Sequence, residues 1–245
     1  MKLKPLPFAF ILFFTINTNG QTHQAKISTN YGNIVIELYD STPKHRDNFI
    51  KLANEHFFDS LLFHRVIKNF VAQAGDPVSK KATDTATLGD GDLGYTVPAE
   101  IIPEKYFHKR GAIGMARDDN PEKASSACQF YIVQGKIADD STFIKAKART
   151  GGYEIPEEHK TVYRTIGGIP HLDSRYTVFG EVVKGMDVVD KICKVETDKN
   201  DRPKKEVRII TVRMLAGKTE KYSKKKIFKY KSSHLDKNEK MKPIY

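Results

Sequence analysis

Residues 63–76 read FHRVIKNFVAQAGD. Around Arg65 this stretch gathers two phenylalanines, two valines and an isoleucine, although a guanidinium keeps its charge and is costly to surround with apolar groups. Two short apolar runs flank Lys68 and Asn69, which predicts a β-hairpin. If its loop is centred on Asn69, Arg65 lies opposite Gln73, whose amide can hold a guanidinium and leave donors free for a ligand. The alternative is an arginine whose stem packs on the surface and whose head is solvated.

The sequence on both sides of this hairpin alternates strand and helix patterns. Residues 26–39 contain apolar residues in period two and predict a second hairpin. A helix is predicted within residues 41–58, with Thr42 as N-cap and Pro43 in the first turn. Another is predicted within residues 182–195. Residues 207–215 read as a closing strand, so the pattern favours a mainly β fold, a barrel or sandwich with helices covering its ends.

Two further motifs lie downstream of the hairpin. Residues 111–135 read GAIGMARDDNPEKASSACQFYIVQG, and residues 170–192 read PHLDSRYTVFGEVVKGMDVVDKI. Together with residues 63–76, these motifs resemble the cyclophilin family of peptidyl-prolyl isomerases, in the same order and at compatible spacings, and most closely its bacterial secreted type. The resemblance implies an eight-stranded antiparallel barrel capped by two helices, with a proline-binding groove on its outer surface.

The resemblance assigns roles to individual residues. It implies that Arg65 is the catalytic arginine and that Gln73 positions it. The remaining residues of the groove would bind substrate, and they are Phe70, Val71, Ala116, Arg117, Gln129, Tyr131, His171, Leu172 and Tyr176. The backbone of Ala116 and Arg117 would hold the peptide beside the proline. Phe63, Phe130 and Phe179 are expected in the core instead.

The reaction implied by the resemblance explains why an arginine is used. Rotation about an X-Pro amide breaks no bond but faces a barrier of about 20 kcal/mol. A site needs only a hydrogen-bond donor for the twisted amide and an apolar wall for the prolyl ring, so no metal or cofactor is expected. The eight histidines show no metal-ligand spacing, and the chain has no glycine-rich phosphate loop.

Some positions depart from the family pattern. His171 stands where many eukaryotic cyclophilins have a groove tryptophan, and the chain has no tryptophan at all. Tyr176 stands where they have a groove histidine. Val71 replaces a usual methionine, and Cys128 a usual serine. These departures affect inhibitor binding and substrate preference more than catalysis.

An insertion occupies about residues 137–169. Its sequence predicts two short helices, the first with Ser141 as N-cap and the second beginning near Pro156, each followed by paired glycines. We expect a helical hairpin beside His171. It would either select substrates or only decorate the barrel.

The two ends of the chain differ from the middle. Residues 1–20 have a positive start and a short apolar run, which predicts a signal peptide and export to the periplasm or beyond; a buried N-terminal strand is the alternative. Residues 218–245 hold ten lysines against three acidic residues, so much of the net charge of +11 lies in this tail. The family resemblance implies that residues 21–217 form the isomerase domain. A solvated tail is favoured over one that binds anionic surfaces or nucleic acid.

Two functions from different classes are consistent with the sequence. The first is an exported isomerase, expected as a monomer, which assists the folding of proline-containing polypeptides. The second is a cyclophilin-like module that binds proline-containing segments with little turnover. No integral membrane segment is expected in the mature chain, and Cys128 and Cys193, which lack any short spacing, are expected as free thiols.

Overall fold

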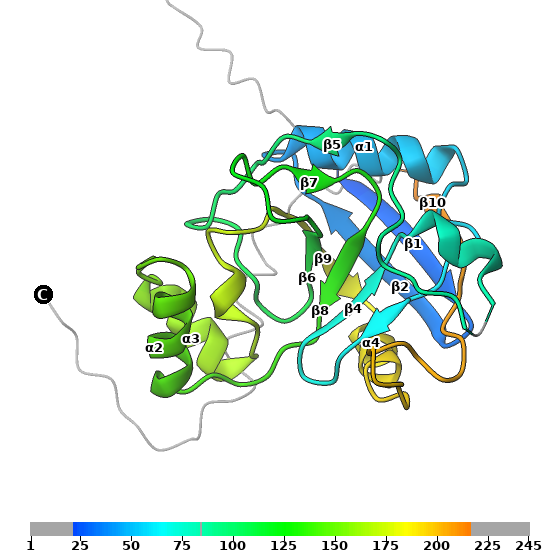
Figure 1. Cartoon of the computed structure of the whole chain (residues 1–245). Helices are drawn as coiled ribbons and strands as arrows, with labels where there is room; N and C mark the ends of the chain where they lie inside the picture. Colours follow the sequence, from blue (N-terminus) through cyan, green and yellow to red (C-terminus); the bar gives the residue numbers. More distant parts are fainter. Residues whose placement is uncertain (1–21, 84, 217–245) are drawn as a thin grey trace, which may run out of the picture. The chain divides into compact units, whose positions relative to one another are not determined.

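The computed structural model describes residues 22–83 and 85–216, so the predicted signal peptide and basic tail lie outside the described residues. Eight antiparallel strands form one curled sheet in the order β10-β1-β2-β9-β6-β8-β4-β3 (Figure 1). Their bounds are β1 His23–Thr29, β2 Gly32–Leu38, β3 Arg65–Val66, β4 Val71–Ala74, β6 Ala112–Met115, β8 Phe130–Val133, β9 Val178–Lys184 and β10 Ile209–Met214. A separate two-stranded sheet pairs β5 Thr96–Val97 with β7 Ser125–Ser126.

Backbone hydrogen bonds outside the regular strand pairs connect the two edges of the sheet, at β10 and beside β3. The Ser60 N–H donates to the Ile209 carbonyl at 2.9 Å, and the Ile209 N–H donates to the Leu61 carbonyl at 2.8 Å. The Phe63 N–H donates to the Val207 carbonyl at 2.8 Å. The segment before β3 therefore contacts β10, which protects edges that would otherwise expose unpaired backbone groups. The predicted eight-stranded antiparallel fold is confirmed.

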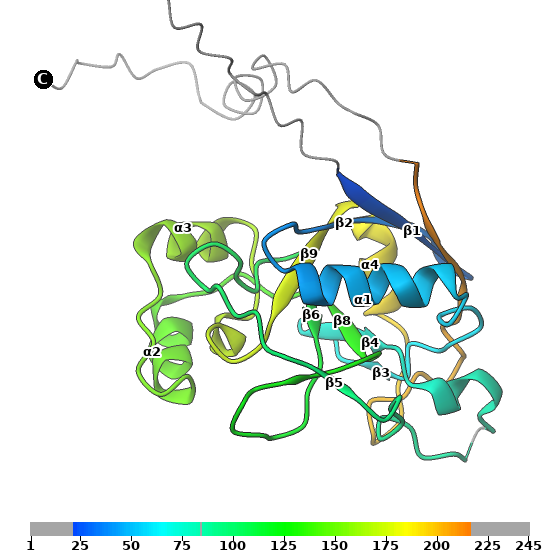
Figure 2. The same cartoon turned by 90° about the horizontal axis from the view of Figure 1, so that it is seen from above.

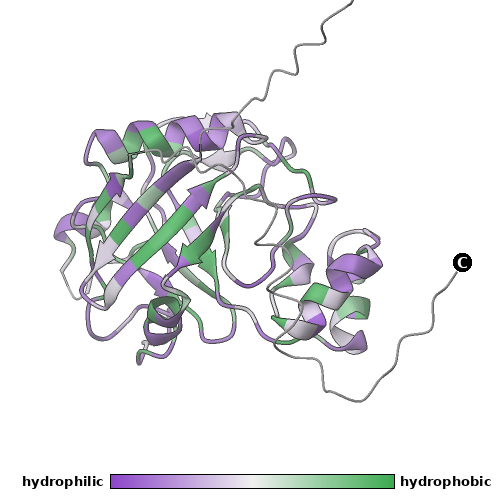
Figure 3. Ribbon diagram, turned by 180° about the vertical axis from the view of Figure 1, so that it is seen from behind, coloured by the Kyte–Doolittle hydropathy of each residue, from purple (hydrophilic) through white to green (hydrophobic). Residues whose placement is uncertain are grey.

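The core lies inside the curled sheet. Alternate residues of β2 point into it, and Figure 3 shows hydrophobic stretches on the strands of the sheet. Phe63, Phe130 and Phe179, predicted as core residues, are at most 1% exposed. The Phe49 ring meets the Phe130 ring edge-on at 5.6 Å, so aromatic side chains from α1 and β8 fill the centre.

Within the described residues, four α-helices accompany the sheet. Two of them were expected from the family resemblance, and the other two form the insertion. Helix α1 (Pro43–Asn54) and helix α4 (Met186–Ile192) lie at opposite ends of the sheet (Figures 1 and 2). Thr42 is the N-cap of α1 by position, but its hydroxyl donates to the Tyr39 carbonyl and makes no cap bond. Instead, the Glu100 carboxylate accepts from the Lys44 and His45 N–H groups at 3.1 and 3.0 Å. A distant residue thus satisfies the free donors at this helix terminus.

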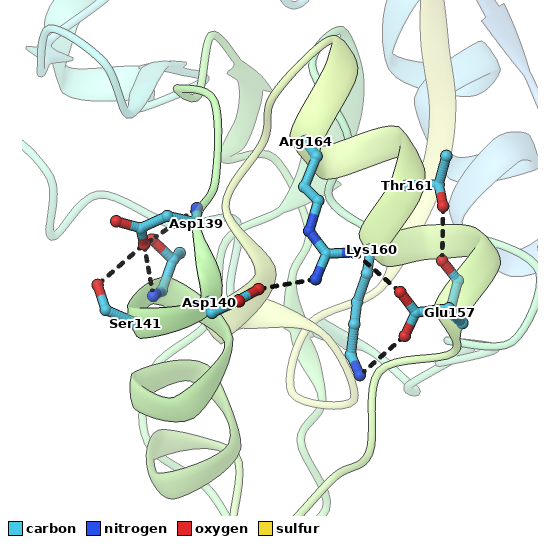
Figure 4. A network of polar contacts seen from close by, with 8 residues as sticks. Asp139, Asp140, Ser141, Glu157, Lys160, Thr161 and Arg164 are labelled. Atoms are coloured by element: carbon cyan, nitrogen blue, oxygen red, sulfur yellow. Dashed lines mark hydrogen bonds and ion pairs between the residues drawn. The ribbon is translucent and has the colours of Figure 1, made fainter.

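The insertion forms the predicted pair of helices, α2 (Asp140–Arg149) and α3 (Glu157–Thr165). The prediction of Ser141 as N-cap was wrong: Asp139 caps α2, accepting from the Thr142 N–H at 2.8 Å within a capping box. Figure 4 shows that Arg164 of α3 donates to Asp140 of α2 at 2.7 Å, which links the two helices. Arg164 also donates to Glu157 of its own helix at 2.8 Å. Such exposed ion pairs contribute little to the stability of the fold. The buried cluster beneath them holds the helices together, and it consists of Ala138, Phe143, Ala146, Ile155 and Tyr163.

The described residues also contain two 3₁₀-helices, η1 (Pro77–Lys81) and η2 (Pro170–Leu172). Helix α2 contacts η2, so the insertion lies beside His171 as expected. Cys128 and Cys193 are buried free thiols. Within residues 22–83 and 85–216, no helix is long and apolar enough to cross a membrane, and no group of histidine, cysteine and acidic residues could hold a metal ion.

Candidate active site

The β3–β4 hairpin places Arg65 directly opposite Gln73, which confirms the predicted register. Its loop closes through a bond from the Phe70 N–H to the Ile67 carbonyl at 3.1 Å. Asn69 takes φ +62° there, a left-handed conformation that asparagine adopts more readily than most residues. A short local turn therefore sets the position of both polar side chains.

Among the described residues, the Arg65 guanidinium makes two long polar contacts. Its Nη1 donates to Gln73 Oε1 at 3.5 Å, and its Nε lies 3.5 Å from Asp201 Oδ2. The side chain is 41% exposed. Long contacts to two acceptors orient the planar group while leaving most of its five donors for a ligand.

A chain of amide hydrogen bonds orients Gln73. Its Nε2 donates to Gln129 Oε1 at 3.1 Å. The Gln129 Nε2 in turn donates to the carbonyls of Gly89 and Gly91 at 2.7 and 2.8 Å. Because carbonyl oxygens only accept, these bonds assign the Gln129 amide and then the Gln73 amide, so that Gln73 turns its oxygen toward Arg65.

Arg65 and Gln73 border a hollow of about 170 Å³. Nine of the eleven predicted site residues line it, and they are Arg65, Phe70, Val71, Gln73, Ala116, Arg117, Tyr131, Leu172 and Tyr176. The other two adjoin it. His171 stacks on Phe70 with ring centres 5.7 Å apart and an interplanar angle of 6°, and Gln129 bonds to Gln73. The hollow thus combines aromatic and aliphatic walls with the side chains of Arg65, Gln73 and Arg117.

The backbone on one side of the hollow differs from the expectation at one residue. The Ala116 N–H donates to the Gln129 carbonyl, and the Ala116 carbonyl accepts from the Ser126 N–H, both at 2.8 Å. Ala116 therefore serves mainly as wall. Arg117 is different, because its backbone N–H and C=O have no hydrogen-bond partner among the described residues. An extended peptide could pair with these two groups.

The side chain of Arg117 makes its contacts within the protein. It is only 4% exposed, and its Nε donates to the Arg175 carbonyl at 3.1 Å. Its guanidinium also lies over the Tyr176 ring, 5.0 Å from the centre. This stacking fixes Tyr176 at the edge of the hollow.

Two histidines and one cysteine near the hollow are held neutral at pH 7 by burial. Burial, with a smaller effect from Arg149, lowers the pKa of His171 to about 4. Burial also lowers the pKa of His64, which adjoins Arg65 in the chain, to about 4. Burial raises the pKa of Cys128 to about 11, so it is no thiolate nucleophile at neutral pH. None of these three groups is poised for proton transfer near pH 7, whereas the Arg65 guanidinium keeps a fixed positive charge.

Comparison with known proteins agrees with this geometry. The sequence profile of the family described as "Cyclophilin type peptidyl-prolyl cis-trans isomerase/CLD" matches residues 24–214. The chain belongs to the cyclophilin-type peptidyl-prolyl cis-trans isomerase family. The match covers all three motifs and the insertion between them.

Individual cyclophilin relatives support the assignment. A Streptococcus pyogenes serotype M6 protein, named as a bifunctional phosphatase/peptidyl-prolyl cis-trans isomerase, is 37% identical over 189 residues, which cover 76% of this chain. "Peptidyl-prolyl cis-trans isomerase-like 2" of Rhizopus delemar is 33% identical over 202 residues, covering 82% of this chain. The matches span 37% and 30% of those two relatives, so the chain corresponds to about a third of each.

A solved structure shares the fold. It is the Cryptosporidium parvum cyclophilin-type isomerase determined in the presence of the dipeptide Ala-Pro, with a TM-score of 0.58 and 25% identity. The similarity covers 79% of this chain and 99% of that one.

Two residues near the cyclophilin groove escaped the sequence analysis. Asp201 approaches Arg65 from a loop near the end of the domain, with its carbonyl accepting from the Val66 N–H at 2.8 Å. Gly114 makes room for Tyr131, since a Cβ there would lie 2.3 Å from the Tyr131 Cζ atom. No sequence pattern marks either residue. Each matters through a contact with a residue on another segment.

Proposed function

We propose that this protein is a peptidyl-prolyl cis-trans isomerase in which Arg65 is the catalytic residue and Gln73 its positioning partner. The observation that carries the proposal is the placement of the oriented Arg65 guanidinium beside a hollow of about 170 Å³ that has aromatic and aliphatic walls. Phe70, Val71 and Leu172 would hold the prolyl ring, together with Tyr131 and Tyr176. The free backbone groups of Arg117 would hold the residues next to the proline.

The mechanism needs no covalent step. As the X-Pro amide twists, its nitrogen regains a lone pair and its carbonyl loses conjugation, and the uncatalysed barrier is about 20 kcal/mol. The Arg65 donors would bond the twisted amide more strongly than the planar one. The prolyl ring stays in the hollow while the other half of the peptide turns. One preorganised donor of this kind lowers the barrier by about 3 to 4 kcal/mol.

The location of the protein determines which polypeptides it can meet as substrates. We propose that residues 1–20 direct export, that the mature protein is a monomer in the periplasm or outside the cell, and that it assists the folding of exported proteins. Support comes from the positive and apolar composition of residues 1–20. N-terminal sequencing of the secreted protein should begin at Gln21, and an unprocessed chain confined to the cytoplasm would contradict the proposal.

Turnover on an Ala-Pro tetrapeptide tests the enzymatic proposal. Magnetisation exchange between the cis and trans peptide signals should accelerate on adding the full-length protein. Accelerated exchange supports the isomerase. Peptide binding without accelerated exchange would instead identify a binding module.

A further inference from the structure

A buried chain of polar side chains links the insertion to the floor of the proline hollow. The Tyr163 hydroxyl, on α3, donates to Asp173 Oδ2 at 2.7 Å. Asp173 Oδ1 lies 2.8 Å from His108 Nδ1, and His108 Nε2 lies 2.9 Å from the Tyr131 hydroxyl. None of these four residues is more than 4% exposed. We call this set the Tyr163–Tyr131 chain.

The acceptors fix the direction of its bonds. The Asp173 carboxylate accepts three bonds, since Oδ1 also takes the His108 N–H at 2.9 Å. His108 Nδ1 must therefore carry a proton, and in a neutral ring Nε2 then accepts from the Tyr131 hydroxyl. Every polar atom of the chain finds a partner, which makes such a buried network rigid.

Tyr131 occupies a narrow slot between this chain and the hollow. Its ring lines the hollow and lies edge-on to Tyr176, with ring centres 6.3 Å apart. On the other side it packs on Gly114, where a Cβ would lie within 2.5 Å of the ring and hydroxyl. The bond to His108 fixes the far end of the ring, so the ring cannot tilt freely in its slot.

The Tyr163 end of the Tyr163–Tyr131 chain is also tightly packed. A Cβ on Gly168 would lie 2.4 Å from Tyr163 Cε1, so the backbone after α3 packs directly on the Tyr163 ring. Tyr163 also belongs to the apolar cluster that holds α2 and α3 together. A shift of the insertion would move Tyr163 and, through Asp173, His108.

We propose that the insertion positions the floor of the proline hollow through the Tyr163–Tyr131 chain, with Tyr163, Asp173 and His108 as positioning residues for substrate binding. This inference rests on the proposed isomerase function. It makes the insertion a structural part of the groove. The floor grips the prolyl ring in the planar and twisted states alike, so loosening it removes binding common to both states. KM should then rise while kcat stays nearly unchanged.

The test is Tyr163→Phe in the full-length protein, with Tyr153→Phe as the matched control. Tyr153 packs against the same apolar cluster, but its hydroxyl has no hydrogen-bond partner within the described part of the chain. We expect Tyr163→Phe to raise KM for the Ala-Pro tetrapeptide about three- to tenfold, in the lower part of the range of coupling between contacting residues, with kcat within about twofold. Tyr153→Phe should leave both constants unchanged.

Tyr131→Phe, alone and combined with Tyr163→Phe, completes the cycle. It keeps the ring in the hollow and removes only the bond to His108, so it carries the test if Tyr163→Phe fails to fold. We expect a similar rise in KM, and a double variant little worse than either single one. Unchanged KM in folded single variants, or effects that multiply in the double variant, would overturn the inference. Absence of turnover by the wild-type protein would refute the proposed function instead. In that case the Kd of the peptide, measured by NMR titration on the same variants, would still test the role of the Tyr163–Tyr131 chain.

Discussion

Replacing Arg65 separates a catalytic from a structural arginine. One preorganised donor is worth about 3 to 4 kcal/mol in the transition state, or roughly two to three powers of ten in kcat. The Arg65 side chain is 41% exposed, so water screens part of its charge. We therefore expect Arg65→Ala to lower kcat toward the smaller end of that range, about 100-fold.

Stability should change much less than activity. The contacts of Arg65 with Gln73 and Asp201 are both 3.5 Å long and partly exposed. Such pairs contribute about 0 to 1 kcal/mol, so the melting temperature should fall by a few degrees at most. Arg65→Lys should restore little activity, because an ammonium cannot present a planar fork to Gln73 and the substrate together.

Arg213→Ala provides a control for the loss of a guanidinium. Arg213 is 39% exposed, pairs with Asp59 at 2.6 Å and lies on β10, outside the hollow. Its removal should leave kcat unchanged. Turnover is followed by exchange NMR, and folding by circular dichroism and thermal melting. Wild-type kcat in folded Arg65→Ala protein would refute the catalytic role, and so would a variant that loses stability but is fully rescued by lysine.

Three further predictions concern the tail, inhibitor binding and acid stability. Removing residues 218–245 should leave the melting temperature and turnover nearly unchanged, because the family match ends at residue 214; a large fall in melting temperature would show that the tail belongs to the domain. Cyclosporin should bind weakly, because His171 replaces the groove tryptophan and α2 lies beside it; calorimetry should show tighter binding by His171→Trp, and tight binding by the unmodified protein would contradict the reasoning. The pKa of His64 is about 4 in the folded protein and 6.5 in the unfolded chain, so the unfolded chain binds more protons between these two pH values. The contribution of His64 to the free energy of unfolding should therefore be complete above pH 6.5 and decrease as the pH falls toward 4. His64→Gln should flatten this dependence of the melting temperature, and a stability that rises on acidification would contradict the sign.

Several features of the fold and site were predictable from the sequence because they depend on local patterns. Period-two alternation identified β2, and the spacing of residues 65 and 73 around Asn69 placed Arg65 opposite Gln73. Glycines and prolines bounded the insertion helices. These signals lie within one or two neighbouring elements, so their physical cause is contained in a short stretch of chain.

Other features depend on contacts between distant segments, and only the tertiary structure decided them. Glu100 caps α1, Gln129 orients Gln73, and Asp201 approaches Arg65. Tyr163 reaches Tyr131 through Asp173 and His108. A side chain's hydrogen-bond partner depends on which segments the folded core brings together, and hydrophobic burial, which drives that packing, carries no information about individual polar pairs. The sequence by itself determined that an arginine and a glutamine would share a strand pair beside an apolar surface, whereas the folded chain determined what holds them and how the insertion reaches the groove.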